Sequence, residues 1–192
     1  MIVKKIIELI RNLVCLTGLI VIAPLILIAG LFIVLEDGLP LFFIQERIGK
    51  NKKNFNIIKI RTLKKNTPNT GTHQLKNIHL LKNGKWIRKI KLDEFPQLIN
   101  VLKGDINLVG PRPSLLSQSE LLTERSNKNI YQVKPGITGL AQILGYDMSD
   151  PKKLAEIDET YIINKSMILN CEIILGTFFN YPKKNLKIKF NI

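Results

Sequence analysis

The feature that most constrains this chain is a long apolar run close to its N-terminus. Residues 13–35 read LVCLTGLIVIAPLILIAGLFIVL and contain no charged side chain. A straight helix of this length measures roughly 35 Å, which is enough to cross a hydrocarbon layer of about 30 Å. Pro24 lies in the middle of the run, where its ring removes one helical hydrogen bond and kinks the helix. The run is therefore predicted to enter a membrane as two short helical arms.

The charges on either side of the run favour a hairpin over a simple span. Basic residues flank it on both sides: Lys4, Lys5, Arg11, Arg47 and Lys50. Basic residues near a membrane segment prefer the cytoplasmic side, so a re-entrant helix-break-helix hairpin that enters and leaves by one face suits both ends. A span would violate one of these preferences, although proline also occurs in ordinary spans. We predict a membrane hairpin over residues 1–37 and a cytosolic catalytic domain over residues 38–192.

The net charge limits the kinds of partner. The chain has a formal net charge of +14, all of it in residues 38–192. Such a field attracts nucleic acid, an anionic membrane surface or phosphorylated small molecules. Cys15 and Cys171 are its only cysteines and both lie in apolar stretches, so neither a disulfide framework nor a zinc site with paired cysteines is expected. A reducing environment facing the cytosol fits this composition.

The rest of the chain combines short extended stretches with helical patterns. We expect extended segments at 38–49 and 54–63, a polar surface loop at 64–80, an amphipathic helix from Asp93 to Lys103, and a helix that starts at Pro151. The last apolar stretch, 166–181, is either a core helix or an amphipathic helix that lies on lipid. The predicted fold class is α+β and mainly helical: the membrane hairpin, then a small catalytic domain with interfacial amphipathic helices.

Two adjacent carboxylates, Asp93 and Glu94, stand among basic residues in a chain with only 15 acidic side chains. Phosphoryl transfer needs cations around a phosphate, and a carboxylate can act as its nucleophile while a second holds a divalent ion. The alternative is that both merely complement a helix dipole, which is worth about 0.3–1 kcal/mol. The residues alone leave both interpretations open.

Arg112 lies between Pro111 and Pro113. Both prolines restrict the backbone, and a planar guanidinium on a stiff loop suits the recognition of phosphate. Lys59 lies in the extended segment at 54–63 and is either a solvated side chain or a further phosphate contact.

At the level of whole motifs, the chain resembles the bacterial sugar transferases that are monotopic phosphoglycosyl transferases. The resemblance rests on strings in the same order along the chain: PLFFIQERIG, FNIIKIRTL, LDEFPQLINVLKGDINLVGPRP, KPGITGLAQI and DETYIINKS. It implies transfer of a sugar-1-phosphate from a UDP-sugar to undecaprenyl phosphate through a covalent aspartyl intermediate, with release of UMP. It also implies Mg²⁺ as cofactor and the cytoplasmic face of the bacterial inner membrane as location, at the first membrane step of a surface glycan.

The resemblance also assigns roles to individual residues. Asp93 is the expected nucleophile and Glu94 the expected Mg²⁺ ligand. The expected substrate contacts are Lys59, Arg88, Pro111, Arg112 and Pro113, and the expected break in the membrane hairpin is at Pro24.

Two other functions fit parts of the sequence. A basic membrane-tethered protein could bind nucleic acid, but Trp86 is the only tryptophan and no basic stripe carries stacking aromatics; we expect no nucleic acid. A noncatalytic assembly protein of the same pathway is the other alternative, because Asn170 stands where an aspartate is common in the family. The expected partners are a UDP-sugar, undecaprenyl phosphate and inner-membrane lipid. The sugar, the glycan and the oligomeric state are left open.

Overall fold

The computed structural model describes residues 2–68 and 79–192. These residues form two compact units, which are described in turn. The first unit comprises Met1–Gln45 and Asn56–Gly104, and the second comprises Glu46–Phe55 and Asp105–Ile192. Residues 69–78 of the expected polar loop lie outside the described part of the chain.

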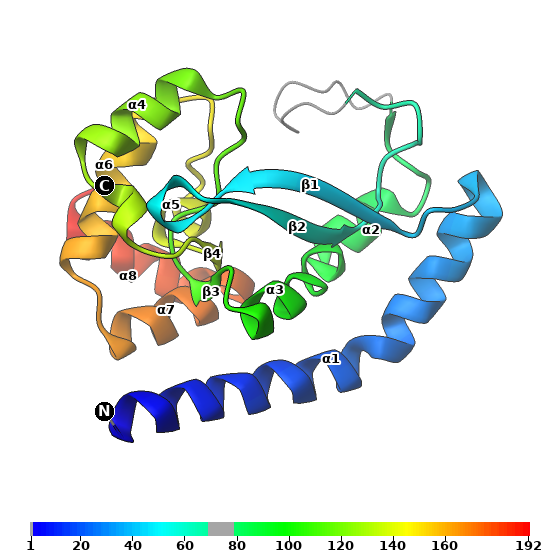
Figure 1. Cartoon of the computed structure of the whole chain (residues 1–192), viewed down its shortest axis with the longest axis horizontal. Coiled ribbons are helices and arrows are strands. Elements are labelled where there is room, and N and C mark those ends of the chain that lie inside the picture. The colour runs from blue at the N-terminus through cyan, green and yellow to red at the C-terminus, as the bar shows by residue number, and fades with distance from the viewer. Residues whose placement is uncertain (1, 69–78) are drawn as a thin grey trace. The chain divides into compact units, whose positions relative to one another are not determined.

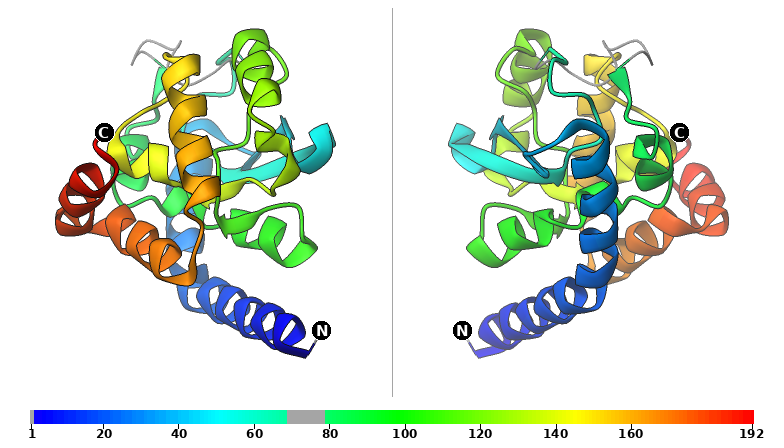
Figure 2. Two further views of the ribbon diagram at one scale, coloured as in Figure 1. Left: turned by 90° about the vertical axis from the view of Figure 1, so that its left-hand side faces the viewer. Right: turned by 90° about the vertical axis from the view of Figure 1, so that its right-hand side faces the viewer.

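The first unit begins with one long apolar helix, α1 (Ile2–Asp37), which contains Pro24. Figures 1 and 2 show that this helix bends along its length. Proline removes only one helical hydrogen bond. The helix therefore continues past Pro24 as one bent rod and does not separate into two arms joined by a loop. The helix ends at Asp37. The division into a membrane hairpin over residues 1–37 and a catalytic domain over residues 38–192 stays a prediction.

The side chains of α1 differ in what covers them. Ala29 and Ile33 are buried in a core with Ile60, Ile87 and Leu92. In both halves of the helix other apolar side chains remain exposed, among them Leu13 at 63%, Ile20 at 66%, Val21 at 70% and Leu27 at 71%. Exposed apolar area on this scale is typical of a helix that meets lipid. By length and composition, α1 is long and apolar enough to cross a membrane.

The remaining elements of the first unit are short. They are α2 (Gly84–Lys89), the 3-10 turn η4 (Leu92–Glu94) and α3 (Gln97–Lys103). Helix α3 ends at Gly104, which has a φ of 82° and caps it in the left-handed conformation that glycine tolerates. The end of this helix was predicted correctly. Its start was not, because α3 begins after Pro96 and leaves Asp93 in the separate turn η4.

The strands β1 (Phe42–Ile48) and β2 (Asn54–Ile60) form a two-stranded sheet, joined by the short turn η1 (Lys50–Lys52). Both extended segments expected from the sequence are present. Residues 46–55, at the turn end of this hairpin, are counted with the second unit.

The second unit is built around a short parallel pair, β3 (Asn107–Val109) and β4 (Gly136–Thr138). A Cβ atom at position 136 would lie 2.1 Å from the nitrogen of Gly110, so only glycine allows the two backbones to approach this closely. The other elements of the unit are α4 (Ser119–Asn127), η5 (Ile130–Gln132), α5 (Leu140–Leu144), α6 (Pro151–Ile163), α7 (Met167–Phe178) and α8 (Asn180–Phe190).

Helix α6 begins where the sequence predicted. The Asp150 side chain accepts a hydrogen bond from the backbone N–H of Lys153, and Pro151 is the first helical residue. Its buried face contributes Leu154, Ile157 and Tyr161 to the core of the second unit. This core places the loop that follows β3 against buried helical side chains.

Helix α7 packs in the core on one side and is exposed on the other, so one of the two roles left open for the last apolar stretch is confirmed and contact with lipid stays a prediction. Leu169 and Ile173 are buried in the core of the second unit, whereas Met167 and Ile168 are each 72% exposed and Phe178 is 59% exposed. Figure 2 shows α7 in orange beside α8 in red, and the two helices contact each other. The predicted fold class is confirmed: a mainly helical α+β chain with a long apolar N-terminal helix and a small following domain.

Candidate functional site

The turn that carries Asp93 and Glu94 is anchored by the residue before them. Leu92 is 1% exposed and packs in the core of the first unit. Lys91 has a φ of 58°, which turns the chain sharply between α2 and η4. The backbone N–H of Glu94 donates to the carbonyl of Lys91 at 3.1 Å. The hydrophobic anchor therefore fixes where both carboxylates emerge, and we call residues 92–94 the acidic turn.

Lys59 and Arg88 surround the acidic turn with positive charge. The Lys59 Nζ atom lies 2.9 Å from Glu94 Oε1, and both side chains are mostly buried, at 14% and 16% exposure. The Arg88 Nε–H donates to Thr62 Oγ1 at 2.8 Å, which fixes the direction of that side chain. The structure thus gathers four of the predicted site residues, from β2, α2 and η4, into one charged cluster of the first unit.

The electrostatics of this cluster distinguish Asp93. Burial raises the pKa of Asp93 above its ordinary value; Lys59 and Arg88 oppose the rise, and Glu94 adds to it. Burial also lowers the pKa of Arg88, against the pull of Asp93 and Glu94. A partly desolvated carboxylate is solvated by few water molecules. The two cations beside it also attract anions to the same place. This is an arrangement suited to a nucleophile that attacks phosphorus.

The other three predicted residues, Pro111, Arg112 and Pro113, form a loop of the second unit directly after β3; we call it the Pro-Arg-Pro loop. Its three carbonyl groups all accept hydrogen bonds. The Gly136 N–H donates to Pro111 O at 2.9 Å, Arg125 Nη1 to Arg112 O at 2.7 Å, and Arg47 Nη1 to Pro113 O at 3.1 Å. The main chain of this loop is therefore held at every residue.

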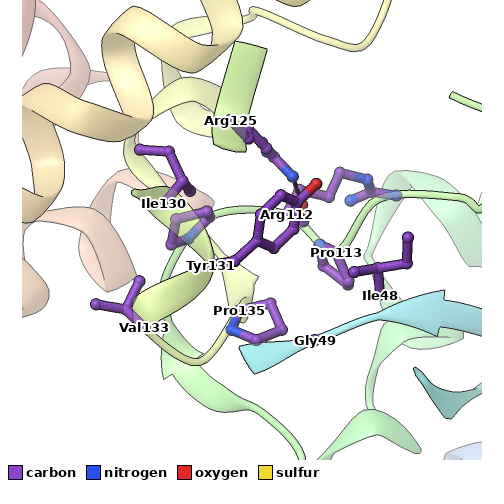
Figure 3. A pocket seen from close by; sticks show the side chains of 10 residues that line it. Ile48, Gly49, Arg112, Pro113, Arg125, Ile130, Tyr131, Val133 and Pro135 are labelled. Atoms are coloured by element: carbon purple, nitrogen blue, oxygen red, sulfur yellow. Dashed lines mark hydrogen bonds between the residues drawn. The ribbon is translucent and has the colours of Figure 1, made fainter. Parts of the chain in front are cut away.

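A shallow hollow that is open to solvent lies beside this loop (Figure 3). The residues that line it are Ile48, Gly49, Pro111, Arg112, Pro113, Arg125, Ile130, Tyr131, Val133 and Pro135. The Lys52 Nζ atom lies 5.8 Å from the centroid of the Tyr131 ring, within cation–π range. The hollow thus combines apolar walls with positive charge.

Arg47 is a charged residue of this region that sequence reasoning did not select. Burial and the nearby charge of Arg112 lower the pKa of Arg47 to about 9. Two guanidinium groups that repel each other form a field that an anion relieves. Arg47 belongs to the QERIG string that carried part of the family resemblance, and that string was the available signal.

The acidic turn supplies the carboxylates that could bind the expected Mg²⁺. Among the described residues, no group of three or more His, Cys, Asp or Glu side chains could hold a metal ion. Mg²⁺ is commonly bound by one or two carboxylates together with substrate phosphates and water, instead of by a cage of protein ligands alone. The carboxylate of Glu94 fits that pattern, in which the substrate completes the site.

Asn170 lies within the second unit. The Tyr161 hydroxyl lies 2.9 Å from Asn170 Oδ1, to which it donates. Burial raises the pKa of Tyr161 to about 12, so the hydroxyl keeps its proton at neutral pH. The amide oxygen of Asn170 therefore fills an acceptor position that an aspartate oxygen could also fill.

A family model described as bacterial sugar transferase matches residues 1–184 of this chain. The chain belongs to that family. This confirms the resemblance drawn from its motifs, and it places the protein among the phosphoglycosyl transferases as an enzyme.

Curated relatives of this sugar transferase give the same assignment. It is 43% identical over 143 residues to the uncharacterized sugar transferase EpsL of Bacillus subtilis, covering 74% of this chain and 70% of the relative. It is 37% identical over 162 residues to the UDP-N-acetylgalactosamine-undecaprenyl-phosphate N-acetylgalactosaminephosphotransferase of Aeromonas hydrophila, covering 81% and 38%. It is 36% identical over 166 residues to the UDP-glucose:undecaprenyl-phosphate glucose-1-phosphate transferase of Caulobacter vibrioides, covering 81% and 61%. This sugar transferase thus spans less than two thirds of the length of the Aeromonas hydrophila and Caulobacter vibrioides relatives.

Proposed function

We propose that this sugar transferase moves a sugar-1-phosphate from a UDP-sugar to undecaprenyl phosphate through a covalent intermediate on Asp93, and that it releases UMP. The observation that carries the proposal is the acidic turn, in which a partly desolvated Asp93 lies in one cluster with Lys59 and Arg88. Two relatives named as undecaprenyl-phosphate sugar phosphotransferases support the choice of donor and acceptor.

The proposed chemistry proceeds in two displacements at one phosphorus atom. In the first, a carboxylate oxygen of Asp93 attacks the sugar-bearing phosphorus of the UDP-sugar. The bond from that phosphorus to the bridging oxygen breaks, and UMP leaves with the oxygen. In the second, a phosphate oxygen of undecaprenyl phosphate attacks the same phosphorus, the bond to Asp93 breaks, and undecaprenyl diphosphate sugar leaves. Both steps accumulate negative charge on the phosphate oxygens, which Lys59 and Arg88 would neutralise.

Glu94 is the residue that would hold Mg²⁺ in this proposal, which leaves Asp93 to act as the nucleophile. When bound, Mg²⁺ supplies positive charge to the diphosphate of the donor and assists departure of UMP. The ion pair between Lys59 and Glu94 at 2.9 Å orients the Glu94 carboxylate.

The Pro-Arg-Pro loop is the proposed contact for the nucleotide diphosphate. Arg112 would form a two-pronged contact with phosphate oxygens, and Arg47, which contributes to the same positive field, would add to the attraction. The prolines on both sides lack N–H groups, so the anion contact of this loop depends on the Arg112 side chain and its own N–H.

We also propose that the enzyme works at the cytoplasmic face of the bacterial inner membrane. The exposed apolar side chains of α1 and the basic residues on both sides of its apolar run support this. In the second unit, exposed Met167, Ile168 and Phe178 on α7 adjoin α8, which carries Lys183, Lys184, Lys187 and Lys189. Apolar side chains next to lysines suit an interface with anionic lipid. A donor dissolved in the cytosol could thus meet an acceptor held in the membrane.

The deciding experiment measures UMP release by the purified, detergent-solubilised chain with Mg²⁺ and undecaprenyl phosphate, across a panel of UDP-sugars. We expect release with at least one donor that depends on the lipid acceptor and disappears in the Asp93→Asn variant. Release that persists in this variant would refute Asp93 as the nucleophile. No release with any donor, from protein that is folded, would favour the noncatalytic alternative.

A further inference from the structure

The second unit contains a buried ion pair that the proposed chemistry does not use. The Nη2 atom of Arg125, on α4, lies 2.5 Å from Asp158 Oδ2, on α6, and its Nε–H donates to the same oxygen at 3.0 Å. The two side chains are only 2% and 3% exposed. A buried ion pair is poor evidence for stability, because apolar residues of similar volume are often at least as stabilising. Stability alone therefore does not account for this pair.

The third nitrogen of the Arg125 guanidinium supplies another explanation. Arg125 Nη1 donates to the carbonyl oxygen of Arg112 at 2.7 Å and to Ser114 Oγ at 2.7 Å. Figure 3 shows Arg125 reaching toward the main chain of Arg112, whose own side chain extends away from it. Ser114 is itself fully buried, and its Oγ atom lies 3.2 Å from the Tyr131 hydroxyl. The guanidinium thus joins α6 to the backbone of the Pro-Arg-Pro loop.

The prolines of the loop make the position of Arg112 especially important. Pro111 and Pro113 have no N–H groups, so the loop cannot surround an anion with backbone donors as a glycine-rich loop does. Its anion contact depends on where one guanidinium is placed. A carbonyl oxygen close to a phosphate would repel it. The carbonyl oxygen of Arg112 instead accepts a hydrogen bond from Arg125.

We propose that Arg125, oriented by Asp158, is a positioning residue that fixes the backbone of Arg112 so that the Arg112 guanidinium can bind the diphosphate of the nucleotide sugar. This inference rests on the function proposed above. Arg125 touches no substrate in it; its effect on binding passes through Arg112.

The test is a double-mutant cycle on the full chain in detergent, read by calorimetric UMP binding and by the kcat and KM of UMP release. The paired replacement Arg125→Met with Asp158→Leu removes both charges together, so neither is left buried alone. We expect weaker UMP binding and a higher KM by roughly ten- to a hundredfold, with a smaller change in kcat, because the Arg112 side chain loses its fixed position. In an Arg112→Ala background the same pair should change UMP affinity by less than about twofold, since coupled residues are not additive.

The matched control is Glu159→Gln. Glu159 is the neighbour of Asp158 in the sequence. It forms an ion pair at 2.5 Å with Lys128, which directly follows α4, so its partner lies outside the Pro-Arg-Pro loop. This variant should bind UMP like the wild type. An equal loss of affinity with and without Arg112, or no loss at all, would overturn the positioning role.

A second variant covers the case in which the paired replacement does not fold. Arg125→Lys keeps a charge near Asp158, but one ammonium cannot reproduce the fork that reaches both Asp158 and Arg112 O, so it should show the same Arg112-dependent loss. Wild-type protein that binds UMP but is unaffected by Arg125→Lys would refute the inference alone. Wild-type protein that neither binds UMP nor releases it from any donor would refute the proposed function itself.

Discussion

The acidic turn of the first unit and the Pro-Arg-Pro loop of the second unit are both assigned to the handling of phosphate, but they are built in opposite ways. In the acidic turn, charged side chains of opposite sign lie together and balance each other, as the contact of Lys59 with Glu94 shows. At the Pro-Arg-Pro loop, Arg112 is repelled by Arg47 of β1, and hydrogen bonds hold the backbone of the loop instead. A nucleophile needs compensation by side chains of opposite charge, whereas an anion receptor needs like charges on a rigid main chain.

Replacing Asp93 should have the largest effect of any single change in either region. Asp93→Asn removes the proposed nucleophile while keeping the shape of the side chain, so we expect UMP release to fall by at least about a thousandfold. A matched Glu159→Gln variant should keep wild-type activity. If Asp93→Asn still forms a phospho-sugar enzyme, detected as a covalent mass increase, then another residue is the nucleophile.

The second-largest expected effect is on stability. It tests the buried ion pair of Arg125 and Asp158, which holds the backbone of the Pro-Arg-Pro loop. Asp158→Leu alone leaves Arg125 buried without its carboxylate and should lower the free energy of unfolding by about 3–5 kcal/mol. Adding Arg125→Met should recover most of that loss, and Glu159→Gln should cost no more than about 1 kcal/mol as a more exposed pair. Thermal unfolding in detergent measures all three. A single variant as stable as the double would show that Arg125 finds another partner.

The pH dependence offers a third test, directed at the acidic turn. The pKa of Asp93 is raised in the folded protein, so between its ordinary and raised values the folded chain binds more protons than the unfolded chain. The free energy of unfolding therefore decreases as pH rises through this interval. Asp93→Asn, which does not titrate, should be more stable than wild type above the interval and equal to it below.

Unfolding of both proteins as a function of pH measures this difference. A difference in stability that persists below the ordinary range of an aspartate would have a packing cause. In the wild type, UMP release should decline on the acid side at a pH above that ordinary range, because the protonated carboxyl is a poor nucleophile.

The smallest expected effect concerns Asn170. Asn170→Asp keeps an oxygen for the Tyr161 hydroxyl, which donates to it at 2.9 Å, so the free energy of unfolding should change by no more than about 1 kcal/mol. We expect UMP release to stay close to that of the wild type. A large gain of activity would show that the asparagine disables the enzyme, as the noncatalytic alternative requires.

Local signals in the sequence identified much of the fold. Gly104 marked the end of α3, and Asp150 with Pro151 marked the start of α6. Each of these effects depends on residues next to one another, through a missing N–H, a left-handed φ or a capping side chain. The start of α3 was misjudged because Pro96 could occupy the first turn of a helix or precede it; in the structure Pro96 precedes α3 as its N-cap residue.

The sequence by itself determined the family, the apolar anchor and the identity of the charged residues, because those properties are carried by composition and by unbroken motifs. Only the tertiary structure brought Lys59 to Glu94, 35 positions away, and Arg125 to Asp158, 33 positions away. Spacing along a chain does not specify which distant charges meet. Burial does, because a charge that is removed from water must find an opposite charge or a hydrogen-bond partner in the folded core.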